Sequence, residues 1–409
     1  MFDLPGEFNY VSPLWRPHVP VYVFRTRDTA GPSISETVVI IVMKEKKVPP
    51  DAFPDRDPSP CRQAGRFESI GVKLPETRLT TKEIMAGVKM WGKIDLEGLT
   101  GIVERRICSA GEDSYTLSIA AARDCLRYSR YRAEDLEMII CCSITRYREG
   151  LNFVYEPPVS LTVKEAIGAS QAMNFDITNA CAGMLTGVYI MNDFIRRGVI
   201  KCGMVISGEY LSSAVRNAVP KVKTVFSGQL ASLTVGDCGA AVIMERAPAG
   251  GGGLHVSNFL TLAKYSDLCI GEPCAYAPGA QMVTAARKIH QVAIADSPPI
   301  LKRALAEAGV EYGDIDHFIP HQTSIRAIYS GGKHLARYLG SNVKNIVTNF
   351  QEYGNTASTT HFLAMYRYLR EGRFKKGDKI LIMAFASGLV IGVVIFTMDD
   401  LVDRYGSAD

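Results

Sequence analysis

The chain has 409 residues, of which 47% are hydrophobic and 22% are charged, and its formal net charge is only +4. This length allows two or three domains, and the small net charge gives no reason to expect nucleic-acid binding. No apolar run reaches the roughly 20 residues of a membrane-spanning helix, and the N-terminus lacks the basic-then-apolar order of a signal peptide, so we expect a cytoplasmic protein without membrane insertion.

The chain has ten cysteines, and no paired C-x-x-C spacing indicates a zinc site. In the cytoplasm thiols stay reduced, so these cysteines are not interpreted as a disulfide framework. We therefore expect no bound metal ion, and any functional cysteine to act as a free thiol.

Residues 1–66 are rich in Pro, Arg and Asp, unlike the sequence that follows them. We interpret 1–66 as a partly irregular N-terminal extension, in which the apolar run Val38–Met43 can form one strand. The body of the protein is predicted to start near Glu68.

Next in the chain, the apolar pattern predicts a helix over Ser118–Tyr128 and a strand over Leu136–Cys142. A long loop through Glu156 follows, and then a largely apolar strand run from Ala172 to Ile177. An amphipathic helix starts directly after that run, with Cys181 at the junction. The start of a helix favours a thiolate over a thiol, and the small residues around Cys181 leave room for a bulky acyl group.

Further along, a strand is predicted at Gly203–Ser207, and the polar segment 209–230 can cover a pocket. A glycine-punctuated core strand is predicted at Val235–Ile243. Near the C-terminus, the apolar strands Lys379–Phe385 and Leu389–Phe396 flank a tight turn at 386–388. A turn of this kind can aim backbone N–H groups into a cavity.

The two halves of the body repeat each other. A shift of 174 residues superposes Gly198 on Gly372 and carries Cys181 onto Asn355, and a shift of 179 carries Cys142 onto His321. We interpret 67–247 and 254–399 as two copies of one α/β unit, joined by the Gly-rich linker 248–253 and followed by a tail, 400–409. Cys181, His321 and Asn355 all fall at strand ends or helix starts, where α/β sheets collect their ligands.

Three segments resemble the active-site signatures of the thiolase superfamily, in particular of 3-oxoacyl-(acyl-carrier-protein) synthase III. They are Asp176–Leu185, Pro320–Arg326 and Tyr353–Ser358, and the likeness spans about residues 68–398. The resemblance implies an α/β thiolase fold with five layers, αβαβα, built from two duplicated halves, and usually a homodimer. It also implies substrates carried on CoA or on the phosphopantetheine of an acyl carrier protein, with no separate cofactor.

The resemblance makes Cys181 the nucleophile that accepts an acyl group, with His321 and Asn355 supporting a second, condensing step. The backbone N–H groups of Cys181 and Ser387 would form an oxyanion hole, although the turn at Ser387 is less glycine-rich than is usual in the family. Arg326 occupies the position of an arginine that similar enzymes direct towards phosphopantetheine or the carrier protein; an ordinary solvated arginine is the alternative.

Glu156 departs from the chain-initiating synthases and resembles the acyl-CoA condensing enzymes of head-to-head hydrocarbon and β-lactone biosynthesis and some cyclising ketosynthases. In those relatives this loop crosses the dimer interface, and the glutamate is thought to act as a base in the partner's active site. The alternative is a surface loop carboxylate. Among the other histidines, His317 is expected to be structural, and His334 and His361 to be solvated or helix-face residues.

We therefore expect a condensing enzyme of fatty-acid-derived or polyketide metabolism, which acylates Cys181 and then forms a C–C bond with a second thioester. That second substrate can be a malonyl carrier, an acyl-CoA or a β-ketoacyl thioester. An acyltransferase that forms an ester or amide remains an alternative, as does a catalytically silent partner subunit. A cysteine peptidase also uses Cys, His and Asn, but the residues around Cys181 lack the peptidase pattern.

Overall fold

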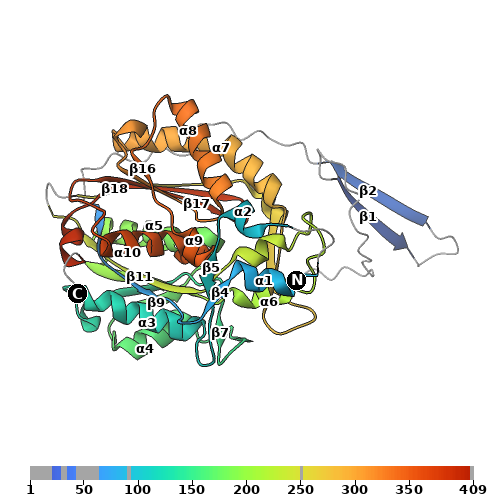
Figure 1. Cartoon of the computed structure of the whole chain (residues 1–409), viewed down its shortest axis with the longest axis horizontal. Helices are drawn as coiled ribbons and strands as arrows, with labels where there is room; N and C mark the ends of the chain where they lie inside the picture. The colour runs from blue at the N-terminus through green and yellow to red at the C-terminus, as the bar shows by residue number, and fades with distance from the viewer. Residues whose placement is uncertain (1–20, 29–34, 43–63, 90–93, 249–251, 406–409) are drawn as a thin grey trace. The chain divides into compact units, whose positions relative to one another are not determined.

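The computed structural model describes residues 21–28, 35–42, 64–89, 94–248 and 252–405 (Figure 1). Met1–Cys61 and Arg62–Asp409 are two separate compact units. In the first unit, β1 (Val21–Asp28) pairs antiparallel with β2 (Ser35–Val42). The sequence predicted one strand in this region, and the structure adds β1 as its partner.

Two five-stranded sheets form the frame of the second unit, and they share one topology. In the first sheet the strand order is β3-β11-β10-β6-β9, and in the second it is β12-β18-β17-β15-β16. In each sheet the first three strands in that order pair antiparallel and the remaining neighbours pair parallel. Their bounds are β3 Gly65–Lys73, β6 Met138–Cys141, β9 Met173–Asp176, β10 Cys202–Glu209, β11 Cys238–Arg246, β12 Gly253–Thr261, β15 His317–Pro320, β16 Asn345–Ile346, β17 Lys379–Ala386 and β18 Val390–Thr397.

Helices complete five layers, αβαβα (Figure 1). The central layer contains α5 (Gly183–Arg197) and α10 (Thr360–Arg370), whose apolar side chains share one core with both sheets. Helices α3 (Ser114–Arg127) and α4 (Val159–Ile167) cover the outer face of the first sheet. Helices α7 (Ala286–Ala308) and α8 (Ile325–Leu339) cover the outer face of the second sheet. The layered, duplicated fold implied by the resemblance is confirmed.

Close packing in the central layer fixes the start of α5. A Cβ atom on Gly187 would lie 2.6 Å from Val205 Cγ1 and 2.8 Å from Cys142 Sγ, so a side chain at this position would collide with β10 and with the residue after β6. The helix therefore lies directly against the first sheet, and its N-terminus is held at the end of β9.

Smaller elements fill the spaces around the sheets. They are β4 (Arg78–Thr80), α1 (Thr81–Gly87), α2 (Leu96–Thr100), β5 (Glu104–Arg106), β7 (Tyr147–Arg148), β8 (Asn152–Phe153), α6 (Ser212–Ala218), β13 (Cys269–Pro273), β14 (Ala280–Thr284), α9 (Phe350–Tyr353) and short 3-10 turns. The predicted polar segment 209–230 contains α6, most of whose residues are buried. Among the described residues, no helix is both long and apolar enough to cross a bilayer.

Several boundaries differ from the predicted ones. The predicted strand Val235–Ile243 begins later, as β11, because Asp237 leaves the strand pattern and accepts hydrogen bonds from the backbone N–H groups of Leu211 and Ser212. Gly65 and Arg66, predicted to belong to the N-terminal extension, are the first residues of β3. Gly253, predicted to end the linker, is the first residue of β12, and residues 249–251 of that linker lie outside the described residues. In the segment 400–409, Tyr405 is buried.

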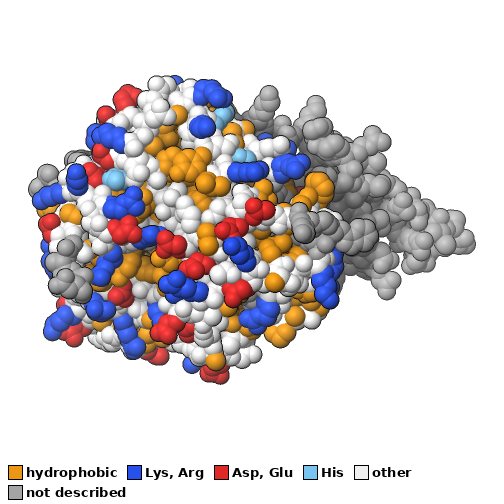
Figure 2. All heavy atoms as spheres, viewed as in Figure 1, with side chains coloured by type: hydrophobic (Ala, Val, Ile, Leu, Met, Phe, Trp, Pro, Cys, Tyr) orange, Lys and Arg blue, Asp and Glu red, His pale blue; other side chains and the backbone are white. Residues whose placement is uncertain are grey.

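Acidic and basic side chains are interspersed over the face of the molecule shown in Figure 2. On this face, the described part of Arg62–Asp409 thus has no large patch of a single charge, in keeping with the small net charge of the whole chain.

Candidate active site

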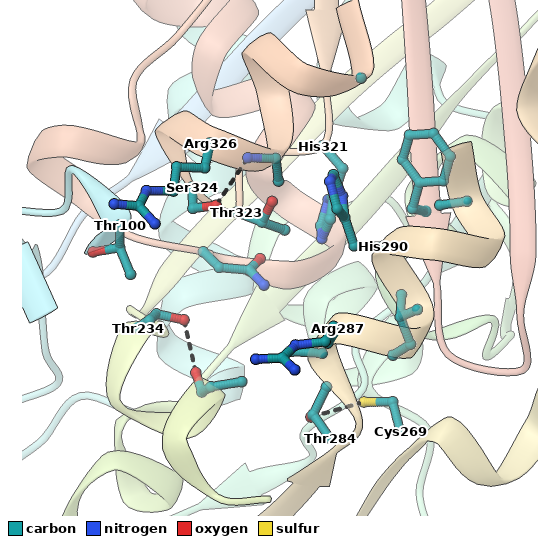
Figure 3. Close-up of a pocket in the computed structure, with 18 of the residues that line it drawn as sticks. Thr100, Thr234, Cys269, Thr284, Arg287, His290, His321, Thr323, Ser324 and Arg326 are labelled. Carbon is teal, nitrogen blue, oxygen red and sulfur yellow. Dashed lines mark hydrogen bonds between the residues drawn. The ribbon is translucent and has the colours of Figure 1, made fainter. Parts of the chain in front are cut away.

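Cys181, His321, Asn355 and Ser387 line one cavity of about 760 Å³. These residues come from both halves of the chain and are brought together where the two sheets face the central helices. The structure therefore gathers the three signature residues and the predicted oxyanion turn at a single site, part of which is drawn in Figure 3.

Cys181 lies in a short 3-10 turn, Ala180–Ala182, between the end of β9 and the start of α5. The preceding residue, Ala180, has a φ of +45°, a left-handed conformation that is unfavourable for a residue with a Cβ atom. Such strain is typical of functional turns that the surrounding structure holds in place. Here it belongs to the turn that presents the Cys181 side chain to the cavity.

Burial raises the pKa of the Cys181 thiol, and the neighbouring thiol Cys269 and carboxyl Glu209 add smaller effects in the same direction. The sequence had predicted that the helix start would favour the thiolate. In the structure burial acts against that effect, because removing the sulfur from water penalises its charged form. The direction of this shift favours the neutral thiol of Cys181.

His321 directly follows β15 and is buried. Burial lowers the pKa of its imidazole to about 4, so the ring is neutral at physiological pH. Gln322 fixes the turn that carries it, since its Nε2 donates to the carbonyl oxygens of Pro320 and Val347, and its Oε1 accepts from Asn349 N.

Asn355 lies just beyond α9, and its backbone bridges to the first half of the chain. Its N–H donates to Thr234 O at 2.9 Å, and its carbonyl accepts from Gly236 N at 3.0 Å. The side-chain Oδ1 accepts from Ala357 N at 3.0 Å. With the oxygen occupied in this way, Nδ2 is the atom that can donate a hydrogen bond to a ligand.

A buried carboxylate that sequence reasoning missed supports the turn after Asn355. Glu209, at the end of β10, is fully buried and accepts hydrogen bonds from Ser358 Oγ at 2.5 Å and Ser207 Oγ at 2.9 Å. The backbone N–H groups of Ile144 and Thr145 also donate to it, at 3.1 and 3.3 Å. Burial raises the pKa of this carboxyl despite these bonds.

The cavity opens at a basic mouth. Arg326 stands in the first turn of α8, which Ser324 caps by accepting a hydrogen bond from Ala327 N at 3.2 Å. Arg287, in the first turn of α7, lines the same opening, and Figure 3 shows both arginines around it. Arg326 is exposed, as either of its predicted roles requires.

The Ser387 turn packs against the strand that carries Cys269, because Ser387 Oγ donates to the carbonyl oxygen of Cys269. Glu156, in contrast, is exposed on the loop between β8 and α4 and does not line the cavity of its own chain. Within one chain, therefore, the structure does not bring Glu156 to Cys181.

His361 is a correction to the sequence interpretation. It is fully buried, its ring centroid lies 5.5 Å from that of His321, and its Nε2 donates to Met383 O at 3.1 Å. In the sequence, its position six residues after Asn355 and on the apolar face of a helix could have indicated that it is buried near the site. His317 instead contacts Asp378 at 3.1 Å and does not itself line the cavity, in keeping with a structural role.

No group of three or more His, Cys, Asp or Glu side chains in the described part of the chain is arranged to hold a metal ion.

Comparison with known proteins identifies the family. A family model described as 3-oxoacyl-[acyl-carrier-protein (ACP)] synthase III matches residues 175–261, and the model of its C terminal part matches residues 305–398. A β-ketoacyl-[acyl-carrier-protein] synthase III of Clostridioides difficile is 30% identical over 342 residues, which cover 80% of this chain and 96% of that protein. The Symbiobacterium thermophilum protein of the same description is 29% identical over 336 residues, covering 80% of this chain and 95% of the relative.

Solved structures agree with this assignment. The crystal structure of 3-oxoacyl-[acyl-carrier-protein] synthase III from Aquifex aeolicus has a TM-score of 0.70 and 26% identity, and the match covers 82% of this chain and all of that one. OleA from Xanthomonas campestris, with bound lauric acid and lauroyl-CoA, has a TM-score of 0.73 at 22% identity, covering 83% of this chain and all of OleA, which shows the shared fold.

The relatives do not favour an enzyme that forms esters or amides, or a silent partner subunit. The chain belongs to the 3-oxoacyl-[acyl-carrier-protein] synthase III family and is an acyl-transferring condensing enzyme of that type.

Proposed function

We propose that Cys181 is the nucleophile of a two-step reaction. In the first step its sulfur attacks a thioester, the acyl group passes to Cys181, and the departing thiolate takes the proton that Cys181 gives up. One thioester replaces another of similar energy, so this step is readily reversible. The observation that carries the proposal is the meeting of Cys181, His321 and Asn355 in one cavity.

In the second step a further thioester loses carbon dioxide or a proton from its α-carbon, and the resulting enolate attacks the acyl carbon on Cys181. The new C–C bond forms as the bond from that carbon to the Cys181 sulfur breaks, so a β-keto product is released and Cys181 leaves as a thiolate that takes up a proton. His321 Nε2–H and Asn355 Nδ2–H can both donate to the enolate oxygen, and one such donor contributes about 3 kcal/mol. Because burial keeps His321 neutral, it acts in this step as a hydrogen-bond donor without transferring its proton. The backbone N–H groups of Cys181 and Ser387 would hold the other oxyanion, on the acyl group.

A homodimer through the first sheet is part of the proposal. β9 is an edge strand, and Met173 on it is 51% exposed, while Tyr155 on the neighbouring loop is 76% exposed. An exposed edge with apolar side chains is suited to pairing with a second copy. In such a dimer the loop of Glu156 could reach the partner's cavity, where its carboxylate would act as the base on the α-carbon; a surface loop carboxylate is the alternative.

The basic mouth supports a substrate carried on an anionic group. Arg326 and Arg287 suit the phosphates of CoA or of a carrier protein's phosphopantetheine, since guanidinium groups bind phosphate with paired donors. The complex of OleA with lauroyl-CoA makes an acyl-CoA a reasonable donor to test here. We place the reaction in fatty-acid-derived or polyketide metabolism in the cytoplasm, where a free thiol nucleophile stays reduced.

Intact-protein mass spectrometry tests the nucleophile. The protein is incubated briefly with short, long, aryl and malonyl thioesters of CoA and of carrier protein, beside Cys181→Ala. A mass gain of one acyl group in the wild type, absent from the variant, supports the proposal. Equal gain in both proteins would place the acyl group elsewhere and refute it.

Glu156 is tested separately, by comparing acylation and condensation in Glu156→Gln. Loss of condensation with intact acylation of Cys181 supports the base, and unchanged turnover contradicts it. An equilibrium sedimentation measurement of the same two proteins reports whether the dimer is present.

A further inference from the structure

The cavity does not end at Cys181 and His321 but continues between α7 and α8, over the outer face of the second sheet. Both helices begin at the basic mouth, and the lining then follows one face of each of them. We call this part the α7–α8 slot; it is lined by Ala293, Ser297, Ile328, Gly331, Leu335 and Phe318.

Small side chains on the facing helices keep the slot open. A Cβ atom on Gly331 would meet no other atom within 4 Å, although this residue lies among the cavity-lining residues. The next residue, Gly332, differs, because a Cβ atom there would lie 3.1 Å from Ile346 Cδ1. Gly332 thus packs closely against Ile346, whereas the space beside Gly331 is not filled by protein.

The chemistry of the lining changes from the mouth to the slot. The Lys and Arg side chains that line the cavity are Arg287, Lys288 and Arg326, all in the first turns of α7 and α8. Beyond those turns the floor of the slot is formed by Phe318 and Leu335, both buried in the apolar core of this layer. His290, Gln291 and Ser297 are the polar side chains that α7 adds to this lining, and none of them is Lys, Arg, Asp or Glu. The slot therefore suits an uncharged, mainly apolar chain, while its carrier group can remain at the charged mouth.

We propose that the α7–α8 slot binds the aliphatic chain of an acyl thioester substrate, so that this enzyme acts on acyl groups much longer than acetyl. The inference rests on the proposed function, since it takes the same cavity to be the site of acyl transfer and condensation. Its basis is the continuity of an apolar, unfilled slot with the cavity that contains Cys181, His321 and Asn355.

The slot has room for a chain of moderate length. From Ile328 to Leu335 the axis of α8 advances by about 10 Å, at roughly 1.5 Å per residue. With C–C bonds of about 1.5 Å, this length accommodates an extended chain of about eight carbons. Each buried methylene group is expected to improve kcat/KM by about fourfold until the slot is full.

A series of saturated acyl-CoA thioesters from two to fourteen carbons tests the proposal, with acylation of Cys181 and formation of the condensed product both measured. For the wild type, at least one of the two steps should improve with chain length and level off near the capacity of the slot. Gly331→Leu places a side chain in the slot and should lower kcat/KM for long chains by at least 100-fold, with short chains changed by less than twofold.

Ser330→Leu is the matched control, because it adds the same side chain one residue earlier, at an exposed position outside the cavity lining. It should behave as the wild type does. Ser297→Leu blocks the slot from α7 and repeats the test if Gly331→Leu does not fold. Long-chain activity that survives both blocking variants overturns the slot, even when short-chain acylation proceeds. Failure of the wild type to acylate with any thioester overturns the proposed function itself, and the inference with it.

Discussion

Replacing Ser358 with alanine should separate the two half-reactions of this enzyme. Ser358 is buried in the turn that follows Asn355, and its hydroxyl donates to the Glu209 carboxyl at 2.5 Å. The turn also contains Ala357, whose φ of +50° is unfavourable and must be held by the contacts around it. Without the bond from Ser358, the turn loses its direct link to β10.

The hydrogen bonds that remain at Glu209 set the size of the expected loss in stability. Glu209 Oε1 still accepts from Ser207 Oγ at 2.9 Å and from Ile144 N at 3.1 Å, so the carboxyl is not left without partners. The variant loses the bond to the Glu209 carboxyl and the contact with Ser207 Oγ at 2.7 Å, and the expected loss in the free energy of unfolding is about 1.5–3 kcal/mol. A displacement of Asn355 by about 1 Å should slow condensation by up to roughly 100-fold.

Urea unfolding measures the stability, and two kinetic assays measure function. Acylation of Cys181 is followed by mass, and condensation is followed with enzyme that already has an acyl group on Cys181. We expect Ser358→Ala to acylate at the wild-type rate and to condense slowly. Ser207→Ala is the matched control, because Ser207 donates to the same carboxyl from β10 and contacts the turn only through Ser358 Oγ, at 2.7 Å.

The control should lose comparable stability but condense normally. If Ser358→Ala also condenses at the wild-type rate, the reasoning that links Glu209 to the position of Asn355 is wrong. Equal slowing of both half-reactions would likewise contradict it, because it would indicate general damage to the cavity.

Three further predictions concern pH, substrate binding and packing. Burial lowers the pKa of His321 to about 4 and that of His361 to about 3, from 6.5. Between pH 6.5 and 4 these two histidines therefore bind protons in the unfolded chain but not in the folded one. The free energy of unfolding falls as pH drops through this range. Each histidine should change the free energy of unfolding by about 1.4 kcal/mol per pH unit in this range. His361→Gln should therefore halve the pH dependence that the two histidines contribute. An unchanged dependence, measured by unfolding at several pH values, refutes this. Arg326→Ala should raise KM for CoA thioesters, most strongly at low salt, with kcat unchanged in steady-state assays. Gly187→Ala should lower the free energy of unfolding by about 1–3 kcal/mol, since its Cβ would collide with Val205, whereas a thermal melt like that of the wild type would show that α5 can shift.

The sequence was sufficient for the features that depend on short segments. The run Ala172–Ile177 and the helix after it predicted where Cys181 lies, and β9 and α5 flank it as expected. The repeat predicted two equivalent halves, because glycines and apolar spacing recur after a fixed shift, and the two sheets share one strand order. Each of these signals is carried by residues close together in the chain, where backbone preference and side-chain periodicity act directly.

Other features were decided only by tertiary structure. Glu209 and Ser358 are 149 residues apart, and neither belongs to a motif that predicts their contact. His361 looked like a helix-face residue, but the face on which it lies packs between two sheets and against His321. The direction of the Cys181 pKa shift also depended on the fold, because the cost of removing a thiolate from water is set by all the atoms that surround it, most of which are distant in sequence. Local sequence determines which groups stand at the ends of strands and helices. How deeply these groups are buried, and therefore their protonation and their contacts, depends on atoms from the whole folded chain.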